Sequence, residues 1–153
     1  MDVDVLSHKQ KLDHLFQQIS TIDDEEMKSH WARYLCVLVA GFIENSLRTM
    51  LLKYAASKAH PNVANYVNSR LKNVTNLNNE KIKQLLCSFN SDWGKVIDEN
   101  ILDDQKAAID SILANRHQIA HGQAVGITYA RVDQYYSRVV RSIDVIYEQC
   151  LKI

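Results

Sequence analysis

The chain contains few residues that interrupt helices, with one proline and four glycines among its 153 residues. Proline breaks helices and glycine weakens them, so their scarcity favours long helices joined by few turns. No stretch sustains the alternation of apolar and polar residues that a half-buried strand requires. The sequence therefore excludes a sheet-rich fold and predicts an all-α bundle, in a single domain that spans residues 1–153.

An excess of charge of either sign is also absent. Lysine plus arginine and aspartate plus glutamate each number 18, so the formal net charge is zero. Proteins that coat nucleic acid without regard to its sequence are usually basic. Any contact of this chain with nucleic acid is therefore expected in a small cleft and not over a broad basic surface.

Metal-binding and export signals are missing as well. The three cysteines, Cys36, Cys87 and Cys150, lack the close spacing of metal ligands, which indicates reduced thiols packed among apolar side chains. Residues 1–4 do not begin a basic segment followed by an apolar run, and the apolar run over residues 34–43 is about half the length needed to cross a bilayer. We therefore expect a soluble, cytoplasmic protein with no membrane partner.

Apolar periodicity and turn residues predict one long helix and several shorter ones. The long helix is expected over residues 23–59, because an acidic run opens it and Pro61 bars its continuation. Residues 31–43 within it are apolar on nearly every face, as in a helix at the centre of a bundle or against a partner subunit. The asparagine-rich residues 62–79 predict a short irregular helix followed by a loop. The other expected helices cover residues 5–20, 79–89, a short stretch from 91, 103–121 and 129–151.

Residues 115–122, Asn-Arg-His-Gln-Ile-Ala-His-Gly, carry the strongest functional signal. Arginine binds a phosphate through two hydrogen bonds at once, and histidine both donates and accepts protons near neutral pH. Arg116, His117 and His121 are thus the minimum equipment for cleaving a phosphodiester without a metal. At about 100° per residue, Arg116 falls on the apolar stripe of its helix, where an unpaired charge is costly, and the two histidines lie one turn apart on its flank.

Three interpretations of this segment stay open on the residues alone. In the first, Arg116 is the structural partner of a buried acid such as Glu44, and the histidines are surface residues. In the second, His117 and His121 form a metal-binding pair, although no third ligand is evident. In the third, the segment is a nuclease site. Glu44 has two interpretations as well: an ion pair with Arg48, which follows it by one helical turn, or a position in a cleft where it orients Arg116 or a histidine.

The order of features along the chain resembles the RiboL-PSP-type domains of the HEPN superfamily. The likeness rests on residues 36–44, Cys-Val-Leu-Val-Ala-Gly-Phe-Ile-Glu, on residues 115–122 and on the tyrosine-rich last helix. It extends from residue 30 to the C-terminus and is weakest over residues 62–93. The resemblance implies a HEPN-like helical bundle with one long central helix. It also implies a homodimer, in which the motif helices of two subunits face each other across a cleft.

The resemblance implies a function too. Arg116 and His121 match the nuclease residues of the superfamily, and His117 stands where the superfamily most often has asparagine. The protein is then expected to be a metal-independent endoribonuclease without a cofactor, acting on single-stranded or looped RNA. Toxin–antitoxin systems, phage defence and RNA processing are the expected settings, with an antitoxin or regulatory protein as a further partner. The residues expected to bind or orient the RNA are Glu44, Arg48, Asn115 and Tyr136.

Two other classes of function stay open. A non-catalytic HEPN-like module would bind a nucleotide, an RNA or a cognate protein, and a purely structural bundle would only dimerise. The intact arginine and histidine of the motif favour the nuclease over both.

Overall fold

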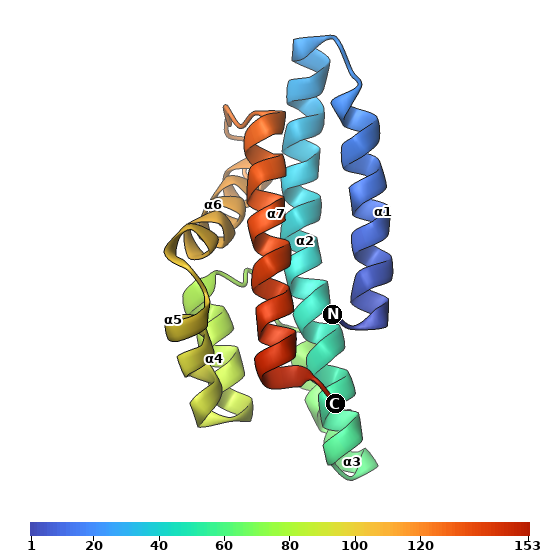
Figure 1. Ribbon diagram of the computed structural model, residues 1–153, viewed down its shortest axis with the longest axis vertical. Helices are drawn as coiled ribbons and strands as arrows, with labels where there is room; N and C mark the ends of the chain where they lie inside the picture. The colour runs from blue at the N-terminus through green and yellow to red at the C-terminus, as the bar shows by residue number, and fades with distance from the viewer.

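Helices α1, α2 and α7 run side by side along the long axis of the molecule, and α2 lies between the other two (Figure 1). The computed structural model describes all 153 residues. Helix α1 covers Val3–Ser20, α2 covers Glu25–Lys58 and α7 covers Tyr129–Ile146, after which a π-helical turn, η2, covers Tyr147–Leu151. Helix α2 also contacts α3 and α6, so it is the long central helix that the sequence predicts.

The shorter helices extend this layer at one end and along one side of α7 (Figure 1). Helix α6 contacts both α2 and α7, and the loop that follows it leads directly into α7. No strand is present, which confirms the all-α fold class. The bounds are Pro61–Leu71 for α3, Asn79–Phe89 for α4, Ser91–Trp93 for the 3₁₀ turn η1, Gly94–Asn100 for α5 and Asp103–Ala120 for α6.

Local signals place several helix ends where the sequence predicts them. Asp24 caps α2, because its side chain accepts a hydrogen bond of 3.0 Å from the Met27 N–H. Pro61 is the first residue of α3, a position at which its missing N–H costs nothing. Gly122, just after α6, has a φ of 69° and so provides the left-handed turn that ends the motif helix.

Two stretches depart from the prediction. Residues 61–71 form a regular helix, so the irregular part of the asparagine-rich segment is confined to residues 72–78. Within this loop Asn76 has a φ of 55°, a left-handed conformation that asparagine tolerates better than most residues. Cys87 is exposed at the end of α4, where the sequence predicts a buried thiol.

The core of the bundle forms around α2. Leu35, Phe42, Ile43 and Leu47 are completely buried there. By length and composition α2 is apolar enough to cross a membrane, since its most apolar window has a mean hydropathy of 1.5. However, 56% of that window is buried within the protein, which is the pattern of a central bundle helix. The apolar residues of α2 thus serve mainly to build the core.

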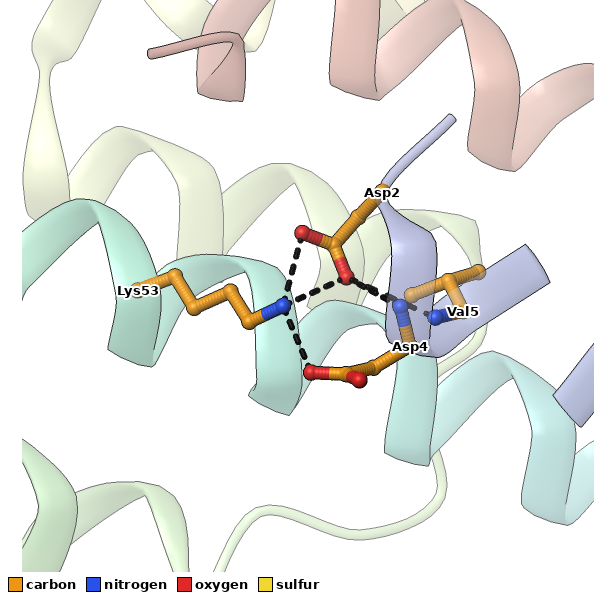
Figure 2. Close-up of polar contacts among 4 residues, drawn as sticks. All are labelled: Asp2, Asp4, Val5 and Lys53. Atoms are coloured by element: carbon orange, nitrogen blue, oxygen red, sulfur yellow. Dashed lines mark hydrogen bonds and ion pairs between the residues drawn. The ribbon is translucent and has the colours of Figure 1, made fainter. Parts of the chain in front are cut away.

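Lys53, Asp2 and Asp4, here called the Lys53 cluster, join the start of α1 to α2 (Figure 2). Lys53 Nζ contacts Asp2 Oδ1 and Oδ2 at 2.9 and 3.0 Å and Asp4 Oδ2 at 2.6 Å. Asp2 also caps α1, because its Oδ1 accepts hydrogen bonds from the Asp4 N–H at 2.9 Å and the Val5 N–H at 3.4 Å. Each charged group of the cluster therefore contacts at least one group of opposite charge.

The cluster shifts the titration of two of its members. Burial alone would raise the pKa of the Asp2 carboxyl, but the hydrogen bonds from Lys53 and from the Asp4 N–H outweigh it and lower that pKa. Hydrogen bonds to Asp4 and Asp2 raise the pKa of Lys53. Both shifts favour the charged forms, so the cluster favours the folded state over a wide range of pH.

Candidate active site

Arg116 lies near the C-terminal end of α6 and reaches across to α2. Its Nη1 donates a hydrogen bond to Glu44 Oε1 and forms an ion pair with it. The side chain of Arg116 is 28% exposed and that of Glu44 13%, so the pair sits at the edge of the core. Glu44 thereby supplies the opposite charge that an arginine on an apolar stripe requires. The intramolecular partner that the first interpretation named is present.

Glu44 nevertheless binds only some of the hydrogen-bond donors of Arg116. A guanidinium carries N–H groups on all of its nitrogens, in a fork that matches the oxygens of a carboxylate or a phosphate. Only Nη1 makes a hydrogen bond within the protein, so the N–H groups of Nε and Nη2 have no protein partner. Since the side chain is also partly exposed, these N–H groups are available to an anion from solvent.

Glu44 and Arg48 hold the loop over residues 72–78 against α2. Glu44 Oε1 accepts a hydrogen bond of 2.9 Å from the Asn76 N–H. Arg48 donates from Nε to the Leu71 carbonyl at 3.2 Å and from Nη2 to the Val74 carbonyl at 3.1 Å. The ion pair between Glu44 and Arg48 that their spacing predicts does not form, because each side chain finds a better-placed partner outside its own helix. Arg48 therefore anchors the loop and does not reach the motif.

His117 and His121 lie together on the exposed end of α6. Their rings meet edge to face, with centroids 4.4 Å apart and planes at 66°. The His121 N–H donates to the His117 carbonyl at 3.2 Å, which places His121 at the end of the helix, directly before Gly122. No group of three or more histidine, cysteine, aspartate or glutamate side chains is arranged to hold a metal ion. The pair thus has the spacing of two ligands but no third one beside it.

Hollows flank the motif helix on two sides. One, of about 390 Å³, lies between α6 and the N-terminal end of α4, and His117 forms part of its wall. The other, of about 300 Å³, lies between α6 and α7 and is lined by Asn115, Arg131 and Tyr135. The Asn115 side chain donates a hydrogen bond of 2.7 Å to the Ser111 carbonyl of its own helix, so its amide oxygen and its second N–H are left for a ligand. Asn115 thus lines a hollow beside the motif helix, on the side away from His117.

Tyr136 does not belong to the motif surface. It is buried, stacks on Phe16 with centroids 4.6 Å apart, and its hydroxyl donates to Asp13 Oδ1 at 2.7 Å. Burial and the hydrogen bond to Asp13 raise the pKa of its hydroxyl far above the ordinary value. The expectation that Tyr136 binds RNA is therefore wrong, because its place on the apolar stripe of α7 turns it towards α1 and the core.

An apolar strip remains exposed along α2. Met27, Trp31 and Tyr34 are 52%, 36% and 50% exposed, and the rings of Trp31 and Tyr34 meet edge to face at 5.7 Å. Their spacing places them, with Leu38, on one side of the helix, and we call these residues the α2 strip. At about 100° per residue, this side of α2 points away from Glu44. The strip is therefore an exposed apolar surface separate from the contact between Glu44 and Arg116.

The groups across the hollow from His117 could not be found from the sequence. Asn78 and Lys81 line the hollow with His117, although they come from the loop before α4 and from α4. The asparagine run indicated a loop but not its position beside the motif. Only the packing of α4 against α6 brings these residues together.

A sequence profile of the RiboL-PSP-HEPN family matches residues 4–152, which is almost the whole chain. The chain therefore belongs to the RiboL-PSP-HEPN family of HEPN domains. Domains of this superfamily are generally ribonucleases or have nucleotide-related functions. No curated protein and no solved structure matches the chain.

Proposed function

We propose that this protein is a metal-independent endoribonuclease that cleaves single-stranded or looped RNA. The observation that carries the proposal is the state of Arg116. It is a partly exposed arginine held by a single carboxylate oxygen, with unused N–H groups, beside two exposed histidines at the end of the same helix. In a chain of the HEPN superfamily, this combination supplies a phosphate ligand and a proton carrier at one place.

The reaction we propose is an internal transfer of the phosphodiester. The ribose 2′-oxygen attacks the adjacent phosphorus, a bond from O2′ to phosphorus forms, and the bond from phosphorus to O5′ breaks. His121 takes the proton from the 2′-hydroxyl or gives one to the leaving O5′, and the equivalent histidine of a second subunit takes the complementary role. The products are a 2′,3′-cyclic phosphate and a free 5′-hydroxyl, so protons balance and no metal is needed.

Arg116 and His117 assist this step in different ways. The free N–H groups of Arg116 would bind the non-bridging phosphate oxygens and stabilise the extra negative charge of the transition state. The hydrogen bond to Glu44 holds the guanidinium in one orientation, so its unpaired N–H groups are already placed for a phosphate. His117, whose ring contacts that of His121, would orient the phosphate or assist protonation of the leaving group.

The same proposal includes a homodimer built on the α2 strip. A second copy of the chain is the occupant that fits, because exposed apolar residues in a row mark an association surface and the resemblance to HEPN nucleases implies a homodimer. Sedimentation at tens of micromolar should show a dimer, since such interfaces persist at these concentrations. Tyr34→Glu should dissociate it, whereas Tyr66→Glu, at a tyrosine on α3 that is 64% exposed, should not. A wild-type monomer would overturn this part.

A labelled single-stranded RNA tests the activity itself. Wild-type protein should cut it in EDTA and leave 2′,3′-cyclic phosphate ends or their opened products. Loss of cutting in chelator, with recovery on addition of a divalent metal, would favour a metal bound by His117 and His121. The cellular setting is a further part of the proposal: a cytoplasmic toxin, phage-defence effector or RNA-processing enzyme, held in check by an antitoxin or regulatory protein. A gene for such a protein beside this one would support it.

A non-catalytic module is the second candidate, and a specific observation favours it. Arg116 already has an acidic partner inside its own subunit, as a purely structural arginine would. Such a module would bind a nucleotide, an RNA or a cognate protein through the same surface. Binding of RNA by wild-type protein without any cleavage would favour this candidate over the nuclease.

A further inference from the structure

We propose that the hollow between α4 and α6 is the subsite for one base of the RNA, next to the bond that is cut, and that it selects a base with an exocyclic amino group. This inference rests on the proposed nuclease function and names the substrate feature that the site reads. We call the hollow the α4–α6 pocket. Its walls include Asn76, Asn78, Lys81, Asp110, Leu113 and His117.

The pocket has the size and the chemistry of a base-binding site. Its volume of about 390 Å³ lies in the range of small-ligand pockets and is ample for one base. Two carboxamides, an ammonium and a carboxylate offer donors and acceptors together, as the edges of bases require. Leu113 gives the base ring an apolar contact. The negative charge of Asp110 would repel a lone phosphate, and the positive charge of Lys81 would repel a lone cation.

Several of its polar groups are free to bind a ligand. Asn78 Oδ1 caps α4 by accepting from the Lys81 N–H at 2.9 Å, which leaves the amide N–H groups of Asn78 as donors. Asp110 Oδ1 accepts from the Asn79 N–H and from Asn79 Nδ2, both at 3.0 Å, which leaves Oδ2 as an acceptor. The side chains of Asn76 and Lys81 make no hydrogen bond or ion pair within the protein.

Asp110 is the residue expected to select the base. A carboxylate oxygen accepts a hydrogen bond from the amino group of adenine, cytosine or guanine, as acidic side chains do when they bind cytosine. Uracil has no amino group, and its one donor on this edge, N3–H, lies between two carbonyl oxygens. A carboxylate that accepts from N3–H is repelled by those oxygens, so uracil should bind less well than a base with an amino group. The pocket should therefore discriminate against uracil.

The pocket is joined to the phosphate-binding arginine through the loop before α4. The Asn76 N–H donates to Glu44 Oε1, the same oxygen that holds Arg116. The side chain of Asn76 lines the pocket together with His117, the residue that follows Arg116 in the chain. An RNA whose phosphate is held by Arg116 thus has the pocket within reach of its neighbouring base.

The test is to sequence the ends produced when the protein cuts a random, unstructured RNA pool. Wild type should disfavour uracil at one fixed position beside the cut by about tenfold or more, since one good base contact is worth about that much. Asp110→Asn should remove or reverse this preference, because an amide can turn its N–H group to the free side while its oxygen still accepts from Asn79. Thermal unfolding checks that the variant is folded.

Two further variants isolate the side chain of Asn76. Asn76→Gly removes its carboxamide, but glycine accepts a φ of 55° without strain and keeps the N–H that binds Glu44, so cutting should continue with a weaker base preference. Asn73→Gly, in the same loop but outside the pocket, should behave as wild type. An absence of base preference in wild type, or an unchanged preference in both Asn76→Gly and Asp110→Asn, would overturn the subsite while leaving the nuclease intact.

Dinucleotides test the subsite separately if wild type cuts no RNA. Titration of the wild-type protein with ApA, CpC and UpU, followed by the NMR signals of the Asn76 and Asn78 side-chain amides, should show binding of ApA and CpC but not of UpU. Asp110→Asn should lose that difference. Equal binding of all three, or binding of none, would overturn the proposed subsite, whichever way the cleavage assay turns out.

Discussion

Lys53 and Arg116 are both cations paired with carboxylates at the surface of α2, but their partners satisfy them to different degrees. Lys53 Nζ contacts three carboxylate oxygens of Asp2 and Asp4, at 2.6 to 3.0 Å (Figure 2). Arg116 contacts one oxygen of Glu44, and that oxygen also accepts from the Asn76 N–H. The first cation has no hydrogen-bonding capacity left, whereas the second keeps most of its own.

This difference separates a structural ion pair from one that is suited to a ligand. An ammonium whose N–H groups all face carboxylate oxygens has no donor left for an anion, and it joins α1 to α2. A guanidinium held at one nitrogen is fixed in place, yet its open edge still attracts an anion. We therefore expect changes at Arg116 to alter activity and changes at Lys53 to alter stability alone.

Arg116→Ala should give the largest effect, a loss of RNA cleavage of about a hundredfold or more, because a transition-state charge contact disappears. Arg116→Lys should fail as well, since an ammonium cannot form the planar two-pronged contact. Cleavage of labelled RNA is measured beside circular dichroism and light scattering on the same samples. Arg138→Ala is the matched control, an arginine of similar exposure paired with Asp104. Wild-type rates in folded Arg116→Ala would contradict the nuclease proposal, and unfolding would make Arg116 structural.

His121→Ala should lower the cleavage rate by about a hundredfold, because it removes a proton carrier. His117→Ala should be milder, about tenfold, if its ring only orients the phosphate and supports that of His121. Single-turnover rates for both variants, with the dimer checked by sedimentation, give the comparison. A larger effect at His117 than at His121 would exchange the two proposed roles.

Glu44→Gln should lower kcat by about tenfold and leave KM nearly unchanged. The amide keeps the shape of the side chain and an oxygen for Arg116, but it loses the charge that fixes the guanidinium in the transition state. Steady-state kinetics separate the two constants, and thermal unfolding measures any structural loss. Higher activity in this variant would mean that Glu44 competes with the phosphate for Arg116 instead of positioning it.

Lys53→Met should give the smallest effect, with unchanged cleavage and a loss of unfolding free energy of about 1 kcal/mol or less, as is typical of exposed ion-pair networks. The loss should shrink in high salt, because salt screens exposed charges. Denaturant unfolding at several salt concentrations checks both points. Reduced cleavage in a stable Lys53→Met protein would remove the distinction between the two cations.

The stabilisation due to the Lys53 cluster should also depend on pH at both ends of the scale. The Asp2 pKa is lowered, so its contribution is present above its ordinary value of 3.8 and is lost as the pH falls through the lowered pKa. The Lys53 pKa is raised, so its contribution is present below its ordinary value of 10.5 and is lost as the pH rises through the raised pKa. The stability difference between wild type and Lys53→Met should therefore be flat between these values.

Local chemistry made much of the fold predictable. The acidic start of α2, the proline that opens α3 and the glycine after α6 act through the backbone within one or two turns, so the sequence shows them directly. The long apolar helix likewise had to be central, since no surface position would bury it. The contact between Glu44 and Arg116 was one of the alternatives that the sequence left open, because the apolar stripe around Arg116 requires an acid nearby.

The remaining parts of the site depend on contacts between distant segments. Arg48 binds carbonyl groups at the end of α3 and in the loop after it, and not its helical neighbour Glu44, and only the folded position of that segment decides between them. Asp110 ties the start of α4 to α6 through Asn79, a pairing that no spacing indicates. Tyr136 shows the opposite case, since its place on the apolar stripe was visible in the sequence and should have outweighed its aromatic chemistry.

The loop over residues 72–78 is held in place by main-chain hydrogen bonds and by the buried side chain of Leu77. Glu44 binds the Asn76 N–H, and Arg48 binds the carbonyl groups of Val74 and of Leu71, the last residue of α3. Mutations of the exposed residues of the loop can therefore change its surface and leave its course unchanged, provided that residue 76 tolerates a left-handed conformation. Selection acting on this family could thus change what the pocket recognises in single steps, without first having to rebuild the scaffold.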